Sequence, residues 1–327
     1  MGRLIDGKWV TEKELEDTIE SGEFKREDTL FRDWIRSDGS TGYEPEVGRY
    51  HLYISRACPW AHRTTIMRRL KGLEDAISMS VVEPVRINDG WEFSEEYPDH
   101  LYNSQFLRQL YQKAAPDANT RVTVPVLWDK QTGTIVNNES REIMRILDTE
   151  FNELAKHDIS LVPDALHEQV EETLDAIYEP INNGVYRSGF ASMQRAYEKA
   201  VRELFEALDH WDGVLDSKRF MCGDQLTEAD IAMFTTLYRF DNVYHVHFKC
   251  NIRRITDYPN LWNYIRELYQ IPAFKETCNM NQIKRHYYKS HTWLNPKQIV
   301  PVGPEINFEA EHDRDRISVE NLAVKEN

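Results

Sequence analysis

Apolar and polar positions alternate between strand-like and helix-like spacing through the first part of the chain. Residues 50–55 (YHLYIS) are rich in aromatic and apolar side chains over the length of a strand. The segment after them predicts a helix ending near Gly72, with four apolar side chains able to share one face: Trp60, Ile66, Met67 and Leu70. Residues 77–82 (ISMSVV) alternate and then become fully apolar, as a strand entering a core does. The opening pattern is therefore strand, helix, strand.

Further helical spacing and two short apolar segments complete this first region. Residues 101–111 place apolar side chains on one side of a helix. Residues 124–129 and 134–136 are short apolar segments joined by a turn-like spacer, which predicts a hairpin. Residues 138–140 then open another helix. The order β-α-β-α-β-β-α up to Glu150 is that of a thioredoxin-like domain, so we expect an α/β fold here.

Beyond a loop near residues 156–163 the spacing is helical almost throughout, which predicts an all-α second domain. At one of its helix starts, Thr227 and Asp230 have the spacing of a capping box. The last residues are acidic and have no periodicity, so we expect them to be mobile. The expected organisation has four parts: an N-terminal extension (1–45), a thioredoxin-like domain (46–150), an all-helical domain (160–304) and a mobile acidic tail (305–327).

Composition and charge exclude several classes of function. The 327 residues include 40 Lys and Arg against 55 Asp and Glu, and a net charge of −15 repels phosphate backbones, so we expect no nucleic-acid partner. The longest apolar run, residues 231–234, is far below the ~18–20 residues of a membrane-spanning helix. The N-terminus lacks the basic start and apolar core of an export signal, which favours a cytoplasmic location. His245, His247 and Cys250 have no fourth ligand in view, so we expect no metal site.

The candidate chemistry begins at Cys58, where the first strand gives way to the first helix. The four cysteines are too few and too scattered for a disulfide framework, so we expect each to be a free thiol. At a helix N-terminus, N–H groups and the positive end of the dipole stabilise a thiolate and lower a cysteine pKa from ~8.5 toward ~3.5–7.5. The alternative interpretation is a buried, inert core cysteine.

Two further segments favour the reactive cysteine. Val124-Pro125 precedes a strand at the place where thioredoxin-like folds hold a cis-proline beside the cysteine, with backbone groups presented to a peptide-like ligand. Glu139 and Ser140 begin the next helix and offer a carboxylate for an ammonium group and a hydroxyl for a carboxylate. Ala61 stands where a dithiol redox protein has its second cysteine, so an external thiol must resolve a mixed disulfide on Cys58. Glutathione, with two carboxylates and an ammonium group, fits this arrangement.

Several blocks resemble the Xi-class glutathione transferases, the glutathionyl-hydroquinone reductases, in order and spacing over residues 1–304. The blocks are RYHLYISRACPWAHRTTIMRRLKGLE, NDGWEF, RVTVPVLWDK, IVNNES, NNGVYRSGF, GDQLTEADI, RFDNVYHVHFKCN and HYYKSH. The resemblance implies the glutathione transferase fold and a homodimer. It also implies reduction of glutathionyl-hydroquinones through a disulfide between Cys58 and glutathione. A second glutathione would resolve that disulfide as co-substrate, without a tightly bound cofactor.

The resemblance assigns ligand-binding roles as well. Glutathione would be held by Trp91, Val124, Pro125, Glu139 and Ser140. The aromatic acceptor would meet Tyr186, Tyr244 and Tyr287, because phenol groups can stack on a quinol ring and donate to its developing oxyanion. Two neighbouring tyrosines are candidates for the same pocket, Tyr178 and Tyr288. Two other functions fit these residues: an Omega-like thioltransferase or dehydroascorbate reductase, and a non-catalytic scaffold that reuses the fold.

Overall fold

The computed structural model describes residues 2–11 and 21–317, which form two compact units. The first unit contains residues 2–11, 27–158 and 279–300 of this described part. The second contains residues 21–26, 159–278 and 301–317. Each unit is therefore assembled from separate stretches of the chain, whereas the sequence predicted consecutive domains.

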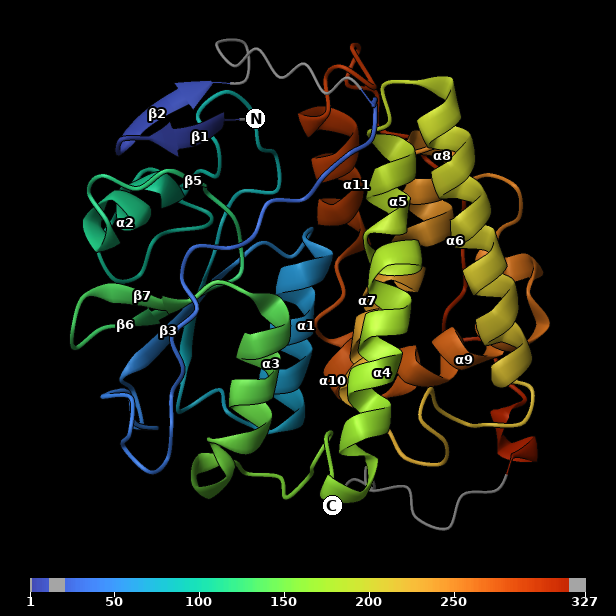
Figure 1. Ribbon diagram of the computed structural model, residues 1–327, viewed down its shortest axis with the longest axis horizontal. Helices are drawn as coiled ribbons and strands as arrows, with labels where there is room; N and C mark the ends of the chain where they lie inside the picture. The colour runs from blue at the N-terminus through green and yellow to red at the C-terminus, as the bar shows by residue number, and fades with distance from the viewer. Residues whose placement is uncertain (1, 12–20, 318–327) are drawn as a thin grey trace. The chain divides into compact units, whose positions relative to one another are not determined.

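A four-stranded sheet forms the centre of the first unit, with strand order β4-β3-β6-β7. The β3–β4 pair is parallel, and β6 pairs antiparallel with both β3 and β7. The strands are β3 (Tyr50–Ile54), β4 (Ser78–Val81), β6 (Val126–Asp129) and β7 (Thr134–Asn137). The helices that follow strands in this unit are α1 (Pro59–Leu70), α2 (Leu107–Ala114) and α3 (Ser140–Thr149), of which α1 and α3 pack together (Figure 1). This order confirms the expected thioredoxin-like arrangement.

Helix α1 is buried on more sides than its apolar pattern predicts. Ile66, Met67 and Leu70 are buried, as expected of one apolar face. His62 and Arg63 are buried as well, and the Arg63 guanidinium lies 4.5 Å from the centre of the Trp60 ring. The cation–π contact compensates part of the cost of withdrawing that charge from water. Polar residues on α1 therefore belong to the core, which a count of apolar positions does not reveal.

His51 on β3 is a second buried polar residue of this unit. Its Nδ1 lies 2.7 Å from the Ser78 hydroxyl and its Nε2 lies 2.9 Å from the Ser80 hydroxyl, both on β4. The side chain is fully buried, and desolvation lowers the pKa of His51 to about 3. The imidazole is therefore neutral in the folded protein at physiological pH, with both ring nitrogens hydrogen-bonded.

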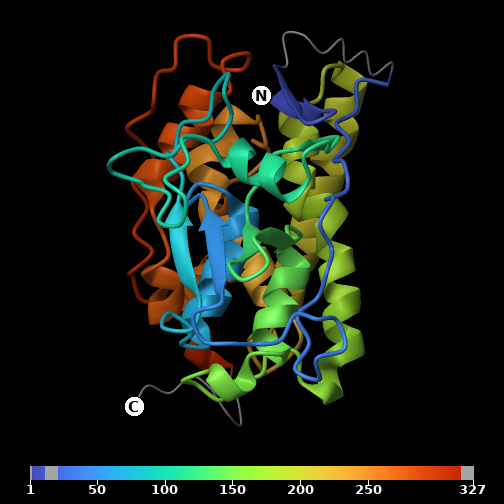
Figure 2. The same cartoon turned by 90° about the vertical axis from the view of Figure 1, so that its left-hand side faces the viewer.

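The N-terminal extension begins with a β-hairpin, which the sequence analysis did not predict. A second sheet has the order β2-β1-β5, formed by β1 (Gly2–Ile5), β2 (Lys8–Thr11) and β5 (Thr120–Arg121) (Figure 1). The hairpin of β1 and β2 is the dark-blue element beside the N-terminus in Figure 2. Asp6 and Gly7 join the first two strands with φ values of 48° and 69°. Asp-Gly is a strong hairpin signal because a two-residue turn of this kind requires positive φ at both positions. The extension is therefore part of a folded sheet at its start.

The second unit is helical, as expected. Helix α7 is buried along its whole length and begins at the predicted capping box, where the Asp230 carboxylate accepts the N–H of Thr227 at 2.8 Å. The longer helices are α4 (His167–Ile177), α6 (Gln194–Val214), α7 (Glu228–Arg239) and α9 (Pro259–Gln270). The shorter ones are α5 (Gly184–Gly189), α8 (His245–His247) and α10 (Pro272–Lys275), with π-helical turns at η4 (Tyr178–Asn182) and η5 (Phe240–Tyr244). Single 3-10 turns of this unit are η3 (Asp164–Leu166), η6 (Ile255–Asp257) and η7 (Arg314–Arg316), and one more, η2 (Asn152–Leu154), belongs to the first unit.

The start of the acidic tail is packed rather than mobile, which corrects the expectation for residues 305–317. Arg314 is fully buried, and its guanidinium donates to the carbonyl oxygens of Leu215, Lys218 and Arg219 at 2.5–2.7 Å. Leu215 is the C-cap residue of α6, where carbonyl groups have no partner within the helix and a cation is favoured, and Lys218 and Arg219 follow shortly after it. Phe308 also packs against Tyr238, Tyr269 and Trp262. Residues 318–327 of the expected tail lie outside the described residues.

Helix α11 (Met280–Ser290) belongs to the first unit, although the sequence predicted it within the helical domain. Its Gln282 amide donates to the Tyr97 hydroxyl at 2.9 Å, and its Ser290 hydroxyl accepts the N–H of Arg86 at 2.9 Å. Both partners come from the irregular segment between β4 and α2. A helical pattern predicts the helix but does not predict which unit it joins.

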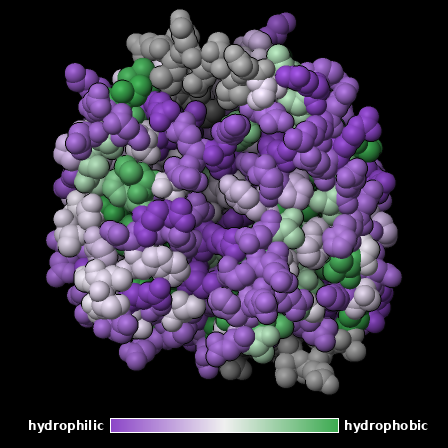
Figure 3. All heavy atoms as spheres, viewed as in Figure 1, coloured by the Kyte–Doolittle hydropathy of each residue, from purple (hydrophilic) through white to green (hydrophobic). Residues whose placement is uncertain are grey.

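The visible surface agrees with the high content of charged residues. Polar and charged side chains cover most of the face in Figure 3, and apolar side chains appear there as small separate patches. Within residues 2–11 and 21–317, no helix combines the length and the apolar character needed to cross a membrane.

Candidate active site

Cys58 is the N-cap residue of α1, with Pro59 as the first helical residue. Its side chain is half-buried, and its Sγ lies 3.5 Å from the carbonyl oxygen of Val124. The first turn of α1 contains no acidic residue. The helix N-terminus therefore offers its dipole to a Cys58 thiolate without a carboxylate in the same turn to oppose it.

The Val124-Pro125 peptide bond is cis, as the sequence predicted. It lies directly before β6, so the strand that pairs with β3 also brings the Val124 backbone to Cys58. Cys58 follows β3 and Val124 precedes β6, and antiparallel pairing of these two strands places both at the same edge of the sheet. Two of the predicted positions thus meet although 66 residues separate them.

Glu139 and Ser140 form the start of α3, directly after β7. Glu139 is the N-cap, and its Oε1 accepts the N–H of Arg141 at 3.3 Å and the hydroxyl of Ser140 at 3.4 Å. Its own N–H donates to Asn137 Oδ1 at 2.7 Å. The carboxylate is thereby held at a helix N-terminus, which favours negative charge. That an ammonium group meets this carboxylate and a ligand carboxylate meets the Ser140 hydroxyl stays a prediction.

Asn138, which directly precedes this pair, has a role that was not predicted from the sequence. Its side chain accepts the N–H of Phe31 at 3.1 Å and donates to the Tyr111 hydroxyl at 3.0 Å, while its own N–H donates to the Phe31 carbonyl at 3.0 Å. These bonds tie the turn before Glu139 to the N-terminal extension and to α2. The sequence signal for this role was the asparagine directly before Glu139-Ser140, because buried side-chain amides are usually hydrogen-bonded.

Trp91 lies in the irregular segment between β4 and α2 and is 3% exposed. Its indole Nε1 is buried and has no hydrogen-bond partner among the described residues. The ring stacks on His286 of α11, with centroids 5.1 Å apart and planes 17° apart, and the Arg86 guanidinium lies 5.3 Å from its centre. An unpaired buried donor is rare in native proteins and marks a place where a ligand can supply the acceptor.

The predicted acceptor tyrosines divide between the two units. Tyr186 and Tyr244 both lie in the second unit, with ring centroids 6.0 Å apart and Phe248 in contact with each. The π-helical turn η5 ends at Tyr244, and π-helical turns are frequent at functional sites. Tyr287 lies in the first unit on α11, 1% exposed and beside His286. That the three share one pocket stays a prediction.

The two neighbouring tyrosines differ in exposure. Tyr178 is 38% exposed at the start of η4. Tyr288 is buried, and desolvation raises its pKa to about 12. Neither observation assigns a role in acceptor binding to them.

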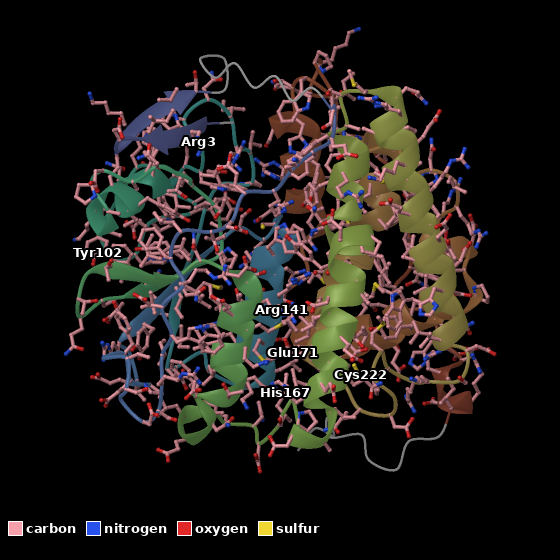
Figure 4. The ribbon with its side chains drawn as sticks, in the orientation of Figure 1. Arg3, Tyr102, Arg141, His167, Glu171 and Cys222 are labelled. Atoms are coloured by element: carbon pink, nitrogen blue, oxygen red, sulfur yellow. The ribbon has the colours of Figure 1, made fainter. Side chains whose placement is uncertain are left out.

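The other three cysteines belong to the second unit. Their surroundings make them less reactive than an ordinary thiol. Cys222 lies against α4, with its Sγ 3.5 Å from the Thr173 hydroxyl, and Figure 4 labels it beside that helix. Burial raises the pKa of Cys222, of Cys250 and of Cys278, the last to about 12. These thiols are therefore protonated at neutral pH.

Comparison with known proteins agrees with this architecture. A family model described as the glutathione S-transferase N-terminal domain matches residues 57–150, and one for the C-terminal domain matches residues 194–267. The chain is 47% identical to glutathionyl-hydroquinone reductase YqjG of Escherichia coli (strain K12), over 96% of this chain and 99% of that protein. It is 44% identical to glutathionyl-hydroquinone reductase PcpF of Sphingobium chlorophenolicum, over 93% and 96% respectively.

Solved structures of glutathione transferases are also similar to this chain. The Xi-class glutathione transferase from Natrialba magadii has a TM-score of 0.91 and 54% identity, with 98% of each chain covered. The glutathione-bound structure of YqjG from Escherichia coli K-12 has a TM-score of 0.88 and 45% identity, with 96% of this chain and 99% of that chain covered. A thioredoxin-like unit joined to a helical unit defines a glutathione transferase. Within that class the chain belongs to the Xi-class family, the glutathionyl-hydroquinone reductases.

Proposed function

We propose that this protein uses glutathione to reduce glutathionyl-hydroquinones to hydroquinones, with Cys58 as the nucleophile. The observation that carries the proposal is the position of Cys58 at the N-terminus of α1, 3.5 Å from the Val124 carbonyl. Ala61 replaces a resolving cysteine in the first turn, and burial raises the pKa of the other three thiols. A nucleophile of this kind requires an external thiol to complete turnover.

The reaction has two steps. In the first, the Cys58 thiolate attacks the sulfur of the glutathionyl group, a new S–S bond forms and the aryl C–S bond breaks. The conjugate reacts as its keto tautomer, in which the ring carbon that carries sulfur also carries a hydrogen. The electron pair of the C–S bond moves into the ring and places negative charge on the ring oxygen, which takes up a proton, and the hydroquinone leaves. In the second step the thiolate of another glutathione attacks the mixed disulfide, which releases oxidised glutathione and the Cys58 thiolate. The sum is one conjugate and one glutathione converted to one hydroquinone and one oxidised glutathione.

The binding residues follow from the same proposal. Glu139 and Ser140 hold the charged end of glutathione, the Val124-Pro125 backbone aligns its peptide bonds beside Cys58, and Trp91 contributes its buried N–H. Tyr186, Tyr244 and Tyr287 contact the aromatic ring and donate to the oxygen that gains charge as the C–S bond breaks. The preformed geometry of Glu139 supports this assignment, because the N–H of Arg141 and the hydroxyl of Ser140 hold its carboxylate before a ligand arrives.

Release of hydroquinone from a glutathionyl-menadiol or glutathionyl-benzohydroquinone conjugate tests the reaction. We expect Cys58→Ala to abolish it and Cys278→Ala, a half-buried thiol with a raised pKa, to retain it. After incubation with oxidised glutathione, intact-mass analysis with peptide mapping should find one glutathionyl group, on Cys58. Full activity of Cys58→Ala, or an adduct on another cysteine, contradicts the mechanism.

A thioltransferase is the second candidate, because the chain is also 47% identical to "glutathione S-transferase omega-like 2" of Schizosaccharomyces pombe. A panel with dehydroascorbate and a simple mixed disulfide separates the two. A kcat/KM for either that exceeds that for the quinol conjugates favours this second function.

The proposal extends to assembly and location: a homodimer in the cytoplasm. Light scattering after size-exclusion chromatography measures the mass in solution. A mass of one chain refutes the dimer.

A further inference from the structure

Helix α11 brings His286 flat against Trp91, and no role in the proposed reaction has yet been given to this histidine. The two rings are 5.1 Å apart and 17° from parallel, and both side chains are at least nine-tenths buried. Parallel aromatic rings at this separation attract each other and fix their relative orientation. The plane of the Trp91 indole is therefore set by a residue almost 200 positions away in the sequence.

The imidazole is itself held in place. His286 Nδ1 lies 2.8 Å from the carbonyl oxygen of Pro84, and since a carbonyl only accepts, Nδ1 carries the hydrogen. One turn later on α11, the Ser290 hydroxyl lies 3.3 Å from the same nitrogen and accepts the N–H of Arg86. The turn of α11 from His286 to Ser290 therefore fixes the imidazole that stacks on Trp91. Through the Arg86 N–H it also fixes the backbone of the segment that contains Trp91.

The orientation of this indole matters because of its N–H. Trp91 Nε1 is buried and has no partner among the described residues, so the direction of this donor is determined by packing alone. Rotation of the ring would direct the donor elsewhere and would break the stack with His286. A donor that is already oriented binds a ligand more tightly than one that must be ordered on binding.

We propose that His286 is a positioning residue for glutathione, which fixes the Trp91 indole so that its N–H meets the bound tripeptide. This inference rests on the proposed function, in which Trp91 contacts glutathione. His286 does not touch the reacting sulfur atoms in this proposal. Its substitution therefore changes the affinity for glutathione and not the rate of the bond-breaking step at saturating glutathione.

Two substitutions separate the stack from the hydrogen bond. His286→Phe retains a ring that can stack but has no donor for Pro84, whereas His286→Asn retains a donor near the position of Nδ1 but has no ring. We expect His286→Asn to weaken glutathione binding by about 2- to 12-fold, the range of a lost aromatic pair, and His286→Phe to remain within about 2-fold of the parent protein. Calorimetry of reduced glutathione binding in a Cys58→Ser background measures this without turnover.

A double-substitution cycle identifies the route of the effect. In a Trp91→Phe background the indole N–H is absent, so His286→Asn should cost no further affinity for glutathione. Unchanged affinity of His286→Asn in the Trp91 protein refutes the proposal. The proposal is also refuted if His286→Asn and His286→Phe lose glutathione affinity equally and both lower kcat and the melting temperature. Those results would indicate that His286 has a structural role alone. Because binding is measured without catalysis, failure of the proposed reduction leaves this result unaffected.

Discussion

The structure predicts that only one of the four cysteines reacts with an alkylating reagent in the native protein. Cys58 is half-buried at a helix N-terminus, whereas Cys278 has a pKa raised to about 12 by burial. At pH 7 a thiol with a pKa of 12 is ionised in about 1 part in 100,000, against about 3% for an ordinary cysteine. Ionisation alone therefore slows the reaction of Cys278 by about 3,000-fold relative to a free thiol.

Cys222 and Cys250 should also be protected, because burial raises the pKa of each and limits access of the reagent. Cys58 should react faster than a cysteine in an unstructured peptide at mildly acidic pH, since the helix N-terminus stabilises its thiolate.

Peptide mapping after timed exposure to iodoacetamide measures all four rates at once. We expect label on Cys58 alone at early times, and none at early times in Cys58→Ala. In denaturant all four cysteines should react at similar rates, which is the control for reagent and mapping. If Cys222, Cys250 or Cys278 is labelled within about tenfold of the rate of Cys58, or if Cys58 reacts more slowly than the peptide thiol, the reasoning is refuted.

Three further predictions concern stability and binding. Arg314→Met should lower the free energy of unfolding by about 3–5 kcal/mol, because three carbonyl oxygens lose their donor and Glu267 is left with its ion pair to Arg219. Arg316→Met, in an exposed pair with Asp216, should cost under about 1 kcal/mol, and equal urea midpoints of the two variants would contradict this. Because the folded pKa of His51 is about 3, the unfolded chain takes up a proton below about pH 6.5 that the folded protein does not. Stability should therefore fall by about 2 kcal/mol between pH 6.5 and 5 on account of His51, and urea titrations of His51→Asn should show a correspondingly weaker pH dependence unless the assignment is wrong. Glu139→Gln should raise the KM for glutathione about tenfold or more with little change in kcat, since a charge-assisted contact is lost; an unchanged KM would exclude Glu139 from binding.

The thioredoxin-like order and three positions in it could be predicted because each depends on a local pattern. Cys58, Pro125 and Glu139 each stand where a strand meets a helix or another strand, and hydrophobic spacing alone locates those junctions. The structure brings Cys58 and Val124 within 3.5 Å by the pairing of β3 with β6. The sequence could therefore indicate a site before any distance was known.

The contacts that join distant segments could not be predicted in the same way. The periodicity of α11 predicts a helix, yet the bonds from Ser290 to Arg86 and from His286 to Pro84 decide which unit it joins. The acidic composition near residue 314 suggested mobility, but one buried guanidinium outweighs it by binding three carbonyl groups. The hairpin at Asp6-Gly7 was different, because its turn signal was present in the sequence and was overlooked.

The division of the first unit between both ends of the sequence has a consequence for synthesis. A ribosome completes residues 27–158 before it makes any of residues 159–278, and α11 follows only after those. At translation speeds of about 5–20 residues per second, that delay is on the order of ten seconds. During it the nascent chain displays the side chains around Pro84, Arg86 and Trp91 that α11 later covers. Chaperones that bind exposed apolar segments therefore have a defined interval, and a defined stretch of chain, on which to act.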